Sequence, residues 1–245
     1  ANGQLWGNAL YDWNRLKRQR FPLWMARLGR LYNQFDVCRL DHFIGFKRYW
    51  RIPAGAKTAR GGKWQPAPGE VFFKAVTKRF GQDKFIAEDL GSVSPAVRKL
   101  RDDFGFPGMK LIQFSFGEDP ESQTHRPYNY SQNSIVYTGT HDNNTTKGWL
   151  NDVKGSKGKK QWATIMGSIP LNADPVWALN LQALNSPANV CILPLQDVLT
   201  LDGKSRMNTP GTAGPQNWSW RLPPGQFDKK TRDLLRRATL GSHRL

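Results

Sequence analysis

The sequence predicts an α/β fold built on a parallel sheet. Short apolar runs of strand length alternate along the chain with segments of helical periodicity, which is typical of parallel strands joined by helices. Several apolar runs end in a carboxylate followed by a turn, which favours an active face at the carboxyl ends of the strands. With 245 residues, the chain is long enough to bury a sizeable core without a disulfide or a structural metal.

A helix is expected after Pro22, because apolar residues recur there at roughly 3.6-residue spacing. These residues are Leu23, Trp24, Ala26, Leu28, Leu31 and Phe35. The chain is expected to continue with a strand over 35–41, a loop over 51–69, a helix over 71–80 and a strand over 84–89. A helix over 94–104 follows, because Pro95 suits a first helical position and Gly105 stands just past the end.

The second half of the chain repeats this alternation. Strands are expected over 109–114, 134–138 and 189–193. Helices are expected over 158–168, 174–184 and 228–240.

The net charge is unusual. The chain holds 36 Lys and Arg against 19 Asp and Glu, a formal net charge of +17, and such an excess raises nucleic acid as a partner. The excess lies in the first 100 and the last 45 residues, and the middle is nearly neutral. The densest basic runs are 15–20 and 154–160, and the second is interpreted as a solvated surface loop. A basic surface on some other kind of protein is favoured over a nucleic-acid partner. The 10 tryptophans can either stack on sugars or fill a core.

The cysteines and the apolar runs bear on location. Cys38 and Cys191 are isolated and form no C-x-x-C pair, which argues against a zinc site and a disulfide framework and favours a reducing cytoplasm. No run reaches the roughly 18 apolar residues of a membrane span. The first residues lack the basic and apolar segments of a secretory signal. A cytoplasmic protein without membrane contact is therefore expected.

Three carboxylates, Asp41, Glu88 and Asp142, stand where apolar runs end. A single residue of this kind is as readily a helix N-cap or a turn residue. Three in succession are harder to explain in that way, because the carboxyl ends of the strands of a parallel barrel converge on one pocket.

The surroundings of two of these carboxylates differ. Arg39 lies on the same strand face as Asp41, which would keep that carboxylate ionised as a nucleophile requires, although a plain structural ion pair has the same pattern. Glu88 has apolar neighbours, which raise a carboxyl pKa and suit a proton donor. Two carboxyls about 5–5.5 Å apart would define a retaining glycosidase-type mechanism.

Several motifs resemble one family. They are RLDHFIGF (39–46), IAEDLG (86–91), FGFPGMK (104–110), YTGTHDNNTTKGW (137–149), PLQDVL (194–199), RMNTPGT (206–212) and NWSWRL (217–222). In this order they closely resemble the 4-α-glucanotransferases called amylomaltase or disproportionating enzyme, of the α-amylase clan. The segment QLWGNALYDW resembles a further family motif, with Ala9 where proline is usual. The resemblance implies a (β/α)8 TIM barrel.

The resemblance also implies roles for single residues. Asp41 matches the family's nucleophile, Glu88 its general acid/base and Asp142 the third carboxylate, which stabilises the transition state. The implied substrate-binding residues are Arg39, His42, His141, Trp6, Asn8 and Tyr11. The implied reaction is transfer of α-1,4-glucan segments between maltooligosaccharides by retaining double displacement, with no metal or cofactor.

Some assignments stay open. His42 would point to the opposite strand face from Asp41 if the strand remained regular there. For each of Trp6, Tyr11, Trp13, Tyr49 and Trp50, core packing is the favoured interpretation, with glucan binding as the alternative. The segment Trp6–Trp13 is the expected exception, because the resembling stretch of the family forms part of a loop over the substrate. Asn208 and Asn217 either contact sugar or cap turns. Cys38 and Cys191 are expected in strands, reduced.

Family members are roughly twice this length, and the match begins in their middle. Residues 1–245 are therefore expected to be the C-terminal part of the catalytic barrel, without its first strands. We expect low stability for the chain alone, with a missing N-terminal half as a partner. The alternatives are an amylase-like hydrolase, or an inactive remnant that binds glucan or a polyanion through its basic surface.

Overall fold

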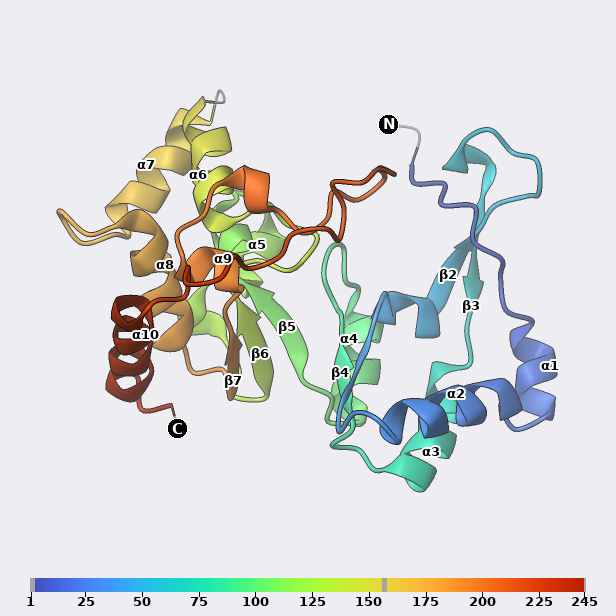
Figure 1. Cartoon of the computed structure of the whole chain (residues 1–245). Coiled ribbons are helices and arrows are strands. Elements are labelled where there is room, and N and C mark those ends of the chain that lie inside the picture. Colours follow the sequence, from blue (N-terminus) through green and yellow to red (C-terminus); the bar gives the residue numbers. More distant parts are fainter. Residues whose placement is uncertain (1–2, 156–157, 245) are drawn as a thin grey trace. The chain divides into compact units, whose positions relative to one another are not determined.

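The computed structural model describes residues 3–155 and 158–244 (Figure 1). The chain divides into two compact units, Ala1–Met109 and Lys110–Leu245. Residues 156 and 157 of the basic run 154–160 lie outside the described residues. The rest of that run closes one helix and begins the next.

Unit 1 pairs parallel strands and covers them with helices. Its strands β1 (Cys38–Leu40) and β4 (Phe85–Ala87) run parallel, with Leu40 opposite Ala87. Ala87 in turn pairs with Gly108, the first residue of β5 (Gly108–Leu111). The helices are α1 (Trp13–Arg18), α2 (Pro22–Tyr32), α3 (Gly69–Phe80) and α4 (Pro95–Asp103).

Phenylalanine rings form much of the core of unit 1. The rings come from α3, from β4 and from the segments that follow β1 and α4, and they are Phe43, Phe46, Phe72, Phe73, Phe85, Phe104 and Phe106. Phe73 is fully buried and lies at ring-centroid distances of 5.0 to 5.4 Å from Phe46, Phe43 and Phe106. This packing fixes the strand ends from which Asp41 and Glu88 project.

Unit 2 repeats the parallel pairing. Its strands β6 (Ser134–Tyr137) and β7 (Val190–Ile192) run parallel, with Val136 opposite Cys191. The helices are α5 (Pro120–Thr124), α6 (Thr146–Gly155), α7 (Lys159–Gly167), α8 (Pro175–Leu184), α9 (Leu195–Val198) and α10 (Lys229–Gly241). Aliphatic residues such as Ile112, Val136 and Leu179 fill its core. The expected α/β class with parallel strands is confirmed in both units.

Two expectations need correction. The segment 51–69 is not all loop, because β3 (Lys63–Pro66) pairs antiparallel with β2 (Arg48–Arg51). The Trp50 indole N–H donates to the carbonyl of Ala59 at 2.8 Å and closes the connection between the two strands. The strand expected over 109–114 ends at Leu111 and becomes a 3-10 helix over Ile112–Phe116, in which the Ser115 hydroxyl donates to the carbonyl of Ile112.

The two cysteines, the end of α4 and the helices bear on three further expectations. Cys38 lies in β1 and Cys191 in β7, and both are free thiols. Gly105 follows α4 with a φ of +64°, in the left-handed region that favours glycine. In the part of the chain that the structure describes, none of the helices combines the length and apolar character needed to cross a membrane.

Candidate active site

Asp41 and Glu88 follow two adjacent strands at the same edge. Leu40 and Ala87 are paired at the ends of parallel strands β1 and β4, and the residue directly after each strand is a carboxylate. The backbone links them further, because the N–H of Glu88 donates to the carbonyl of Leu40 at 3.0 Å, and the N–H of Phe43 donates to the carbonyl of Glu88 at 3.0 Å. The first two carboxylates therefore leave the strands side by side.

The Asp41 carboxylate is open to solvent but held at one oxygen. Its side chain is 77% exposed, and Arg39 Nη1 lies 2.7 Å from Asp41 Oδ1. The Arg39 side chain is more enclosed, and its Nε donates to Met109 Sδ at 3.3 Å. Arg39 and Asp41 are thus in contact as expected, although β1 ends at Leu40 and Asp41 lies just past it. One Asp41 oxygen is oriented by the guanidinium while the carboxylate stays accessible.

Glu88 has different surroundings. Burial raises its pKa to about 7, against the lowering effect of a backbone hydrogen bond from His42 and the positive charge of Arg39. Its Oε2 accepts the His42 N–H at 2.7 Å, and its Oε1 accepts the Leu90 N–H at 3.3 Å. The pKa agrees with the expected proton donor, because a carboxyl near 7 can hold a proton at neutral pH and release it.

His42 does not continue the strand. Its φ is +48°, in the left-handed region, and the chain turns there into a 3-10 helix over Phe43–Phe46. A regular strand would have carried its side chain to the face opposite Asp41, but β1 has already ended at Leu40. The exposed imidazole lies over Gly45, where a Cβ would come within 3.1 Å of His42 Cδ2. Its backbone N–H contacts Glu88.

Asp142 lies in unit 2, in the loop between β6 and α6. Asn208 Nδ2 donates to Asp142 Oδ1 at 2.7 Å, and His141 Nε2 lies 3.3 Å from Asp142 Oδ2. Arg206 Nη2 donates to the backbone carbonyl of Asp142 at 2.6 Å. The side chains of the sequence neighbours His141 and Asp142 are thus in contact. Asn208, for which a sugar contact or a turn cap was expected, orients this carboxylate.

Sequence reasoning missed two residues beside this carboxylate. Arg206 was not singled out, although it begins the RMNTPGT motif. Trp218 was not singled out either; its ring is 5.1 Å from that of His141, and the side chain is 55% exposed. Both stand inside motifs that carried the family resemblance, and that was the available signal. Asn217 caps its own loop, because Oδ1 accepts the Thr209 N–H and Nδ2 donates to the carbonyl of Thr212.

The aromatic candidates near the N-terminus divide into two groups. Trp6 is 56% exposed, and Asn8 is also exposed, in a stretch without regular structure. The Tyr11 hydroxyl accepts from Arg27 Nη1 at 2.7 Å, and its ring lies 5.4 Å from that of Trp24. Trp13 is buried in the core of unit 1.

Of the two aromatic residues of β2, Tyr49 fits the core interpretation, whereas Trp50 is 36% exposed and lies outside the core cluster. Tyr49 packs against the core of unit 1. Trp50 packs edge-on against Trp64 across the β2–β3 pair, with ring centroids 5.3 Å apart.

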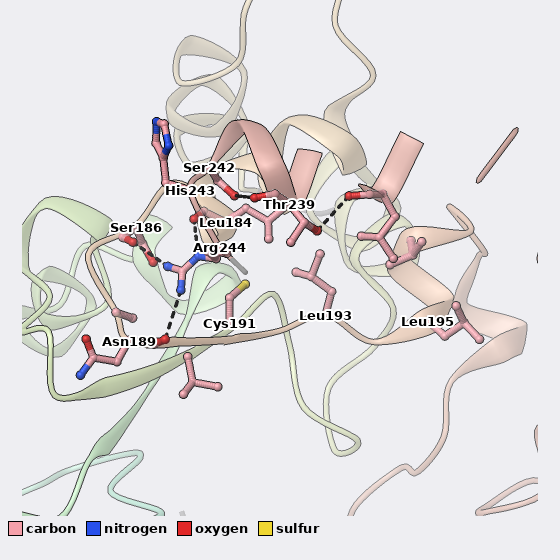
Figure 2. A pocket seen from close by; sticks show the side chains of 14 residues that line it. Leu184, Ser186, Asn189, Cys191, Leu193, Leu195, Thr239, Ser242, His243 and Arg244 are labelled. Carbon is pink, nitrogen blue, oxygen red and sulfur yellow. Dashed lines mark hydrogen bonds between the residues drawn. The ribbon is translucent and has the colours of Figure 1, made fainter. Parts of the chain in front are cut away.

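A cavity of about 690 Å³ lies in unit 2, beside β7 and α10 (Figure 2). Leu193, Cys191 and Thr239 contribute to its wall, and none of the candidate site residues does. Arg244 lines it while donating to the carbonyls of Leu184 and Ser186 at 2.6 and 2.7 Å. Among the described residues, no group of three or more His, Cys, Asp and Glu side chains could hold a metal ion.

Comparison with known proteins points to one family. The glycoside hydrolase family 77 model, described as 4-alpha-glucanotransferase, matches residues 1–227. A 4-alpha-glucanotransferase of Synechocystis is 45% identical over 230 residues, which are 93% of this chain and 45% of that protein. A chloroplastic/amyloplastic 4-alpha-glucanotransferase of Arabidopsis thaliana is 40% identical over 240 residues, 95% of this chain and 41% of that protein.

A solved structure agrees. Amylomaltase from Streptococcus agalactiae, in complex with acarbose, matches with a TM-score of 0.90 and 34% identity over 99% of this chain and 48% of that one. The chain thus spans about half the length of the relatives it matches. The likeness to this enzyme fits the expected partial barrel. The chain belongs to the 4-alpha-glucanotransferase family.

Proposed function

We propose that this chain supplies the catalytic carboxylates of a retaining 4-α-glucanotransferase, which moves α-1,4-glucan segments between maltooligosaccharides. The observation that supports this most strongly is the pairing of Asp41 and Glu88 at the ends of adjacent parallel strands. One carboxylate is exposed and held by an arginine, and the other has a pKa of about 7. A nucleophile and a proton donor require these two contrasting environments.

The reaction proceeds in two displacements. Glu88 in its protonated form gives its proton to the glycosidic oxygen while an Asp41 oxygen attacks C1, so the C1–O bond breaks and a glucosyl ester forms. The shortened glucan leaves as an alcohol. The 4-hydroxyl of a second glucan then attacks C1, Glu88 accepts its proton, and the ester bond to Asp41 breaks. Two inversions at C1 give net retention.

Arg39 orients the nucleophile in this proposal. Its guanidinium occupies one oxygen of Asp41 and leaves the other for C1. Asp142 is assigned the third role, stabilising the positive charge that develops on the sugar and accepting hydrogen bonds from its hydroxyls. The contacts from Asn208 and His141 fix its direction. The substrate-binding residues in the proposal remain Arg39, His42, His141, Trp6, Asn8 and Tyr11.

Transfer is further proposed to require the part of the relatives that lies outside the region matched by this chain. That half is the proposed partner of this chain. A cytoplasmic location is also part of the proposal, supported by the two free cysteines. One relative carries the description chloroplastic/amyloplastic, so the compartment differs within the family.

Incubation with maltotriose tests the proposal. The chain, supplied if needed with the N-terminal half of the Synechocystis relative in trans, should give glucose and a ladder of longer maltooligosaccharides. Asp41→Ala should abolish the ladder, and the exposed, helical Asp103→Asn should not. A wild-type protein that yields only shorter sugars would indicate hydrolysis and contradict the proposal. Full disproportionation by Asp41→Ala would remove the nucleophile assignment.

A further inference from the structure

The short helix α9 carries two adjacent polar side chains that are buried in unit 2. Asp197 is 1% exposed and Gln196 is 8% exposed. Each is hydrogen-bonded to a different segment next to Asp142. Burying a carboxylate is costly unless its oxygens are satisfied, so the partners of Asp197 show what its burial accomplishes.

Asp197 holds both ends of the loop that carries His141 and Asp142. Thr138 directly follows β6, and its hydroxyl donates to Asp197 Oδ2. Thr146 begins α6; its N–H donates to Asp197 Oδ1 at 2.7 Å, and its hydroxyl donates to Oδ2 at 2.8 Å. Thr138 and Thr146 are both fully buried. One carboxylate therefore fixes the start and the end of the segment 139–145.

Gln196 connects to the segment on the other side of Asp142. Its Nε2 donates to the backbone carbonyl of Ser205 at 3.2 Å. The next residue, Arg206, donates to the carbonyl of Asp142, and Asn208 donates to its carboxylate. The Asn208 N–H also donates to the carbonyl of His141 at 3.1 Å. The two segments that meet at Asp142 are thus both tied to α9.

We propose that Asp197 and Gln196 are positioning residues that hold the Asp142 carboxylate in its orientation by tying the segments 139–145 and 203–208 to α9. Burial raises the pKa of Asp197, and the hydrogen bonds from Thr138 and Thr146 oppose that rise. These hydroxyls therefore help to keep the group ionised as an acceptor. The activity test of this inference rests on the proposed function, and the hydrogen-exchange test does not.

Hydrogen exchange in this chain tests the inference without any activity. The loop amides of Thr140 and Asn143 are hydrogen-bonded within the loop, so they report on its order. The double variant Thr138→Val/Thr146→Val keeps side-chain shape and removes both hydroxyls, whereas Thr138→Ser/Thr146→Ser keeps the hydroxyls and removes two methyl groups. We expect exchange over 139–145 to rise about tenfold or more in the valine pair and to stay near wild type in the serine pair.

Two further variants keep the test decisive if the valine pair fails to fold. Asp197→Asn offers one carbonyl oxygen where the carboxylate offers two, and should raise exchange over 139–145. Gln196→Leu should raise exchange over 203–208. Thr239→Val, which removes a helical hydroxyl elsewhere in unit 2, is the matched control and should change neither segment.

Activity gives the second readout. In preparations that disproportionate maltotriose, the valine pair should lose about 100-fold in kcat with KM nearly unchanged, because a displacement of about 1 Å at a catalytic group has that effect. Exchange over 139–145 that is equal in the valine, serine and wild-type proteins would overturn the inference. So would faster exchange in the serine pair alone, because that marks a packing role. A wild-type protein without transfer activity contradicts the proposed function and leaves the exchange result to decide this inference.

Discussion

The backbone N–H of His42 donates a hydrogen bond of 2.7 Å to Oε2 of Glu88. His42 is the residue directly after Asp41, so the turn that follows the proposed nucleophile also holds the proposed acid/base. The bond occupies Oε2 and leaves Oε1 with a longer contact of 3.3 Å to the Leu90 N–H. In the proposed mechanism, Oε1 is therefore the oxygen better placed to carry the proton that goes to the substrate.

Replacing Glu88 by glutamine separates the two displacement steps. Glu88→Gln removes the proposed proton donor, so transfer from natural maltooligosaccharides should fall by about 100-fold or more. A glycosyl fluoride donor needs no proton for departure, so formation of the glucosyl ester should continue and fluoride release should show a burst. Equal loss of both reactions would contradict the role of Glu88 as an acid.

The pH profile of activity should follow the pKa of Glu88. The first displacement, as proposed, needs the protonated form of Glu88, and the pKa of this carboxyl is about 7. The kcat/KM of transfer should therefore decline as pH rises through about 7, with tenfold loss per pH unit beyond it. Initial rates of glucose release from maltotriose over pH 5–9 measure this. A profile that stays level from pH 6 to pH 9 would show that the assignment is wrong.

The same pKa predicts a stability change of definite sign. Burial raises the pKa of Glu88 from 4.5 to about 7, so between these values the folded state binds more protons than the unfolded state. The resulting stabilisation is present below about pH 4.5 and is lost as pH rises to about 7, a loss of about 3 kcal/mol at 1.36 kcal/mol per unit. Thermal unfolding of unit 1 should show this fall, and Glu88→Gln should flatten it.

A second carboxylate of unit 1, Glu70, provides the control for the pH-dependent stability attributed to Glu88. Glu70 is exposed, and a hydrogen bond from Lys47 lowers its pKa. Glu70→Gln should therefore leave the fall between pH 4.5 and 7 in place. Loss of the fall in both variants would show that it does not come from Glu88.

Asp89, the neighbour of Glu88, should affect stability and not the chemistry directly. Its side chain is 3% exposed, forms an ion pair with Arg101 and accepts the Met109 N–H at 2.8 Å. Asp89→Asn leaves the guanidinium of Arg101 with the exposed Asp102 as its remaining charge partner, so unit 1 should lose about 1–3 kcal/mol. Urea unfolding measures this. A loss below about 1 kcal/mol, as for an exposed pair, would contradict the structural role.

The aromatic core of unit 1 gives a test of packing. Phe73 is fully buried among other phenylalanine rings, so Phe73→Ala should cost about 3–5 kcal/mol. Hydrogen exchange should rise in β1 and β4 and much less in β6 and β7, because the core of unit 2 is a separate cluster. Equal loosening of all four strands would show that the two cores unfold together.

The sequence by itself determined those helices, strands and candidate site residues whose placement follows from local rules. Helix α4 could be located from Pro95 at its start and Gly105 past its end, because both residues act through their own backbone. Arg39 and Asp41 could be placed together because strand side chains alternate with a period of two. The raised pKa of Glu88 could be expected from its apolar neighbours.

Only the tertiary structure decided what depends on distant parts of the chain. Trp64 faces Trp50 across β2 and β3 because the connecting segment folds back, which no periodicity in 51–69 indicated. Asn208 and Asp197 reach the loop of Asp142 from more than fifty residues away. His42 leaves the strand through a left-handed backbone, which allows its N–H to bind Glu88. Contacts of this kind depend on how the helices, strands and loops pack against one another, and the spacing of residues along the sequence does not reveal that packing.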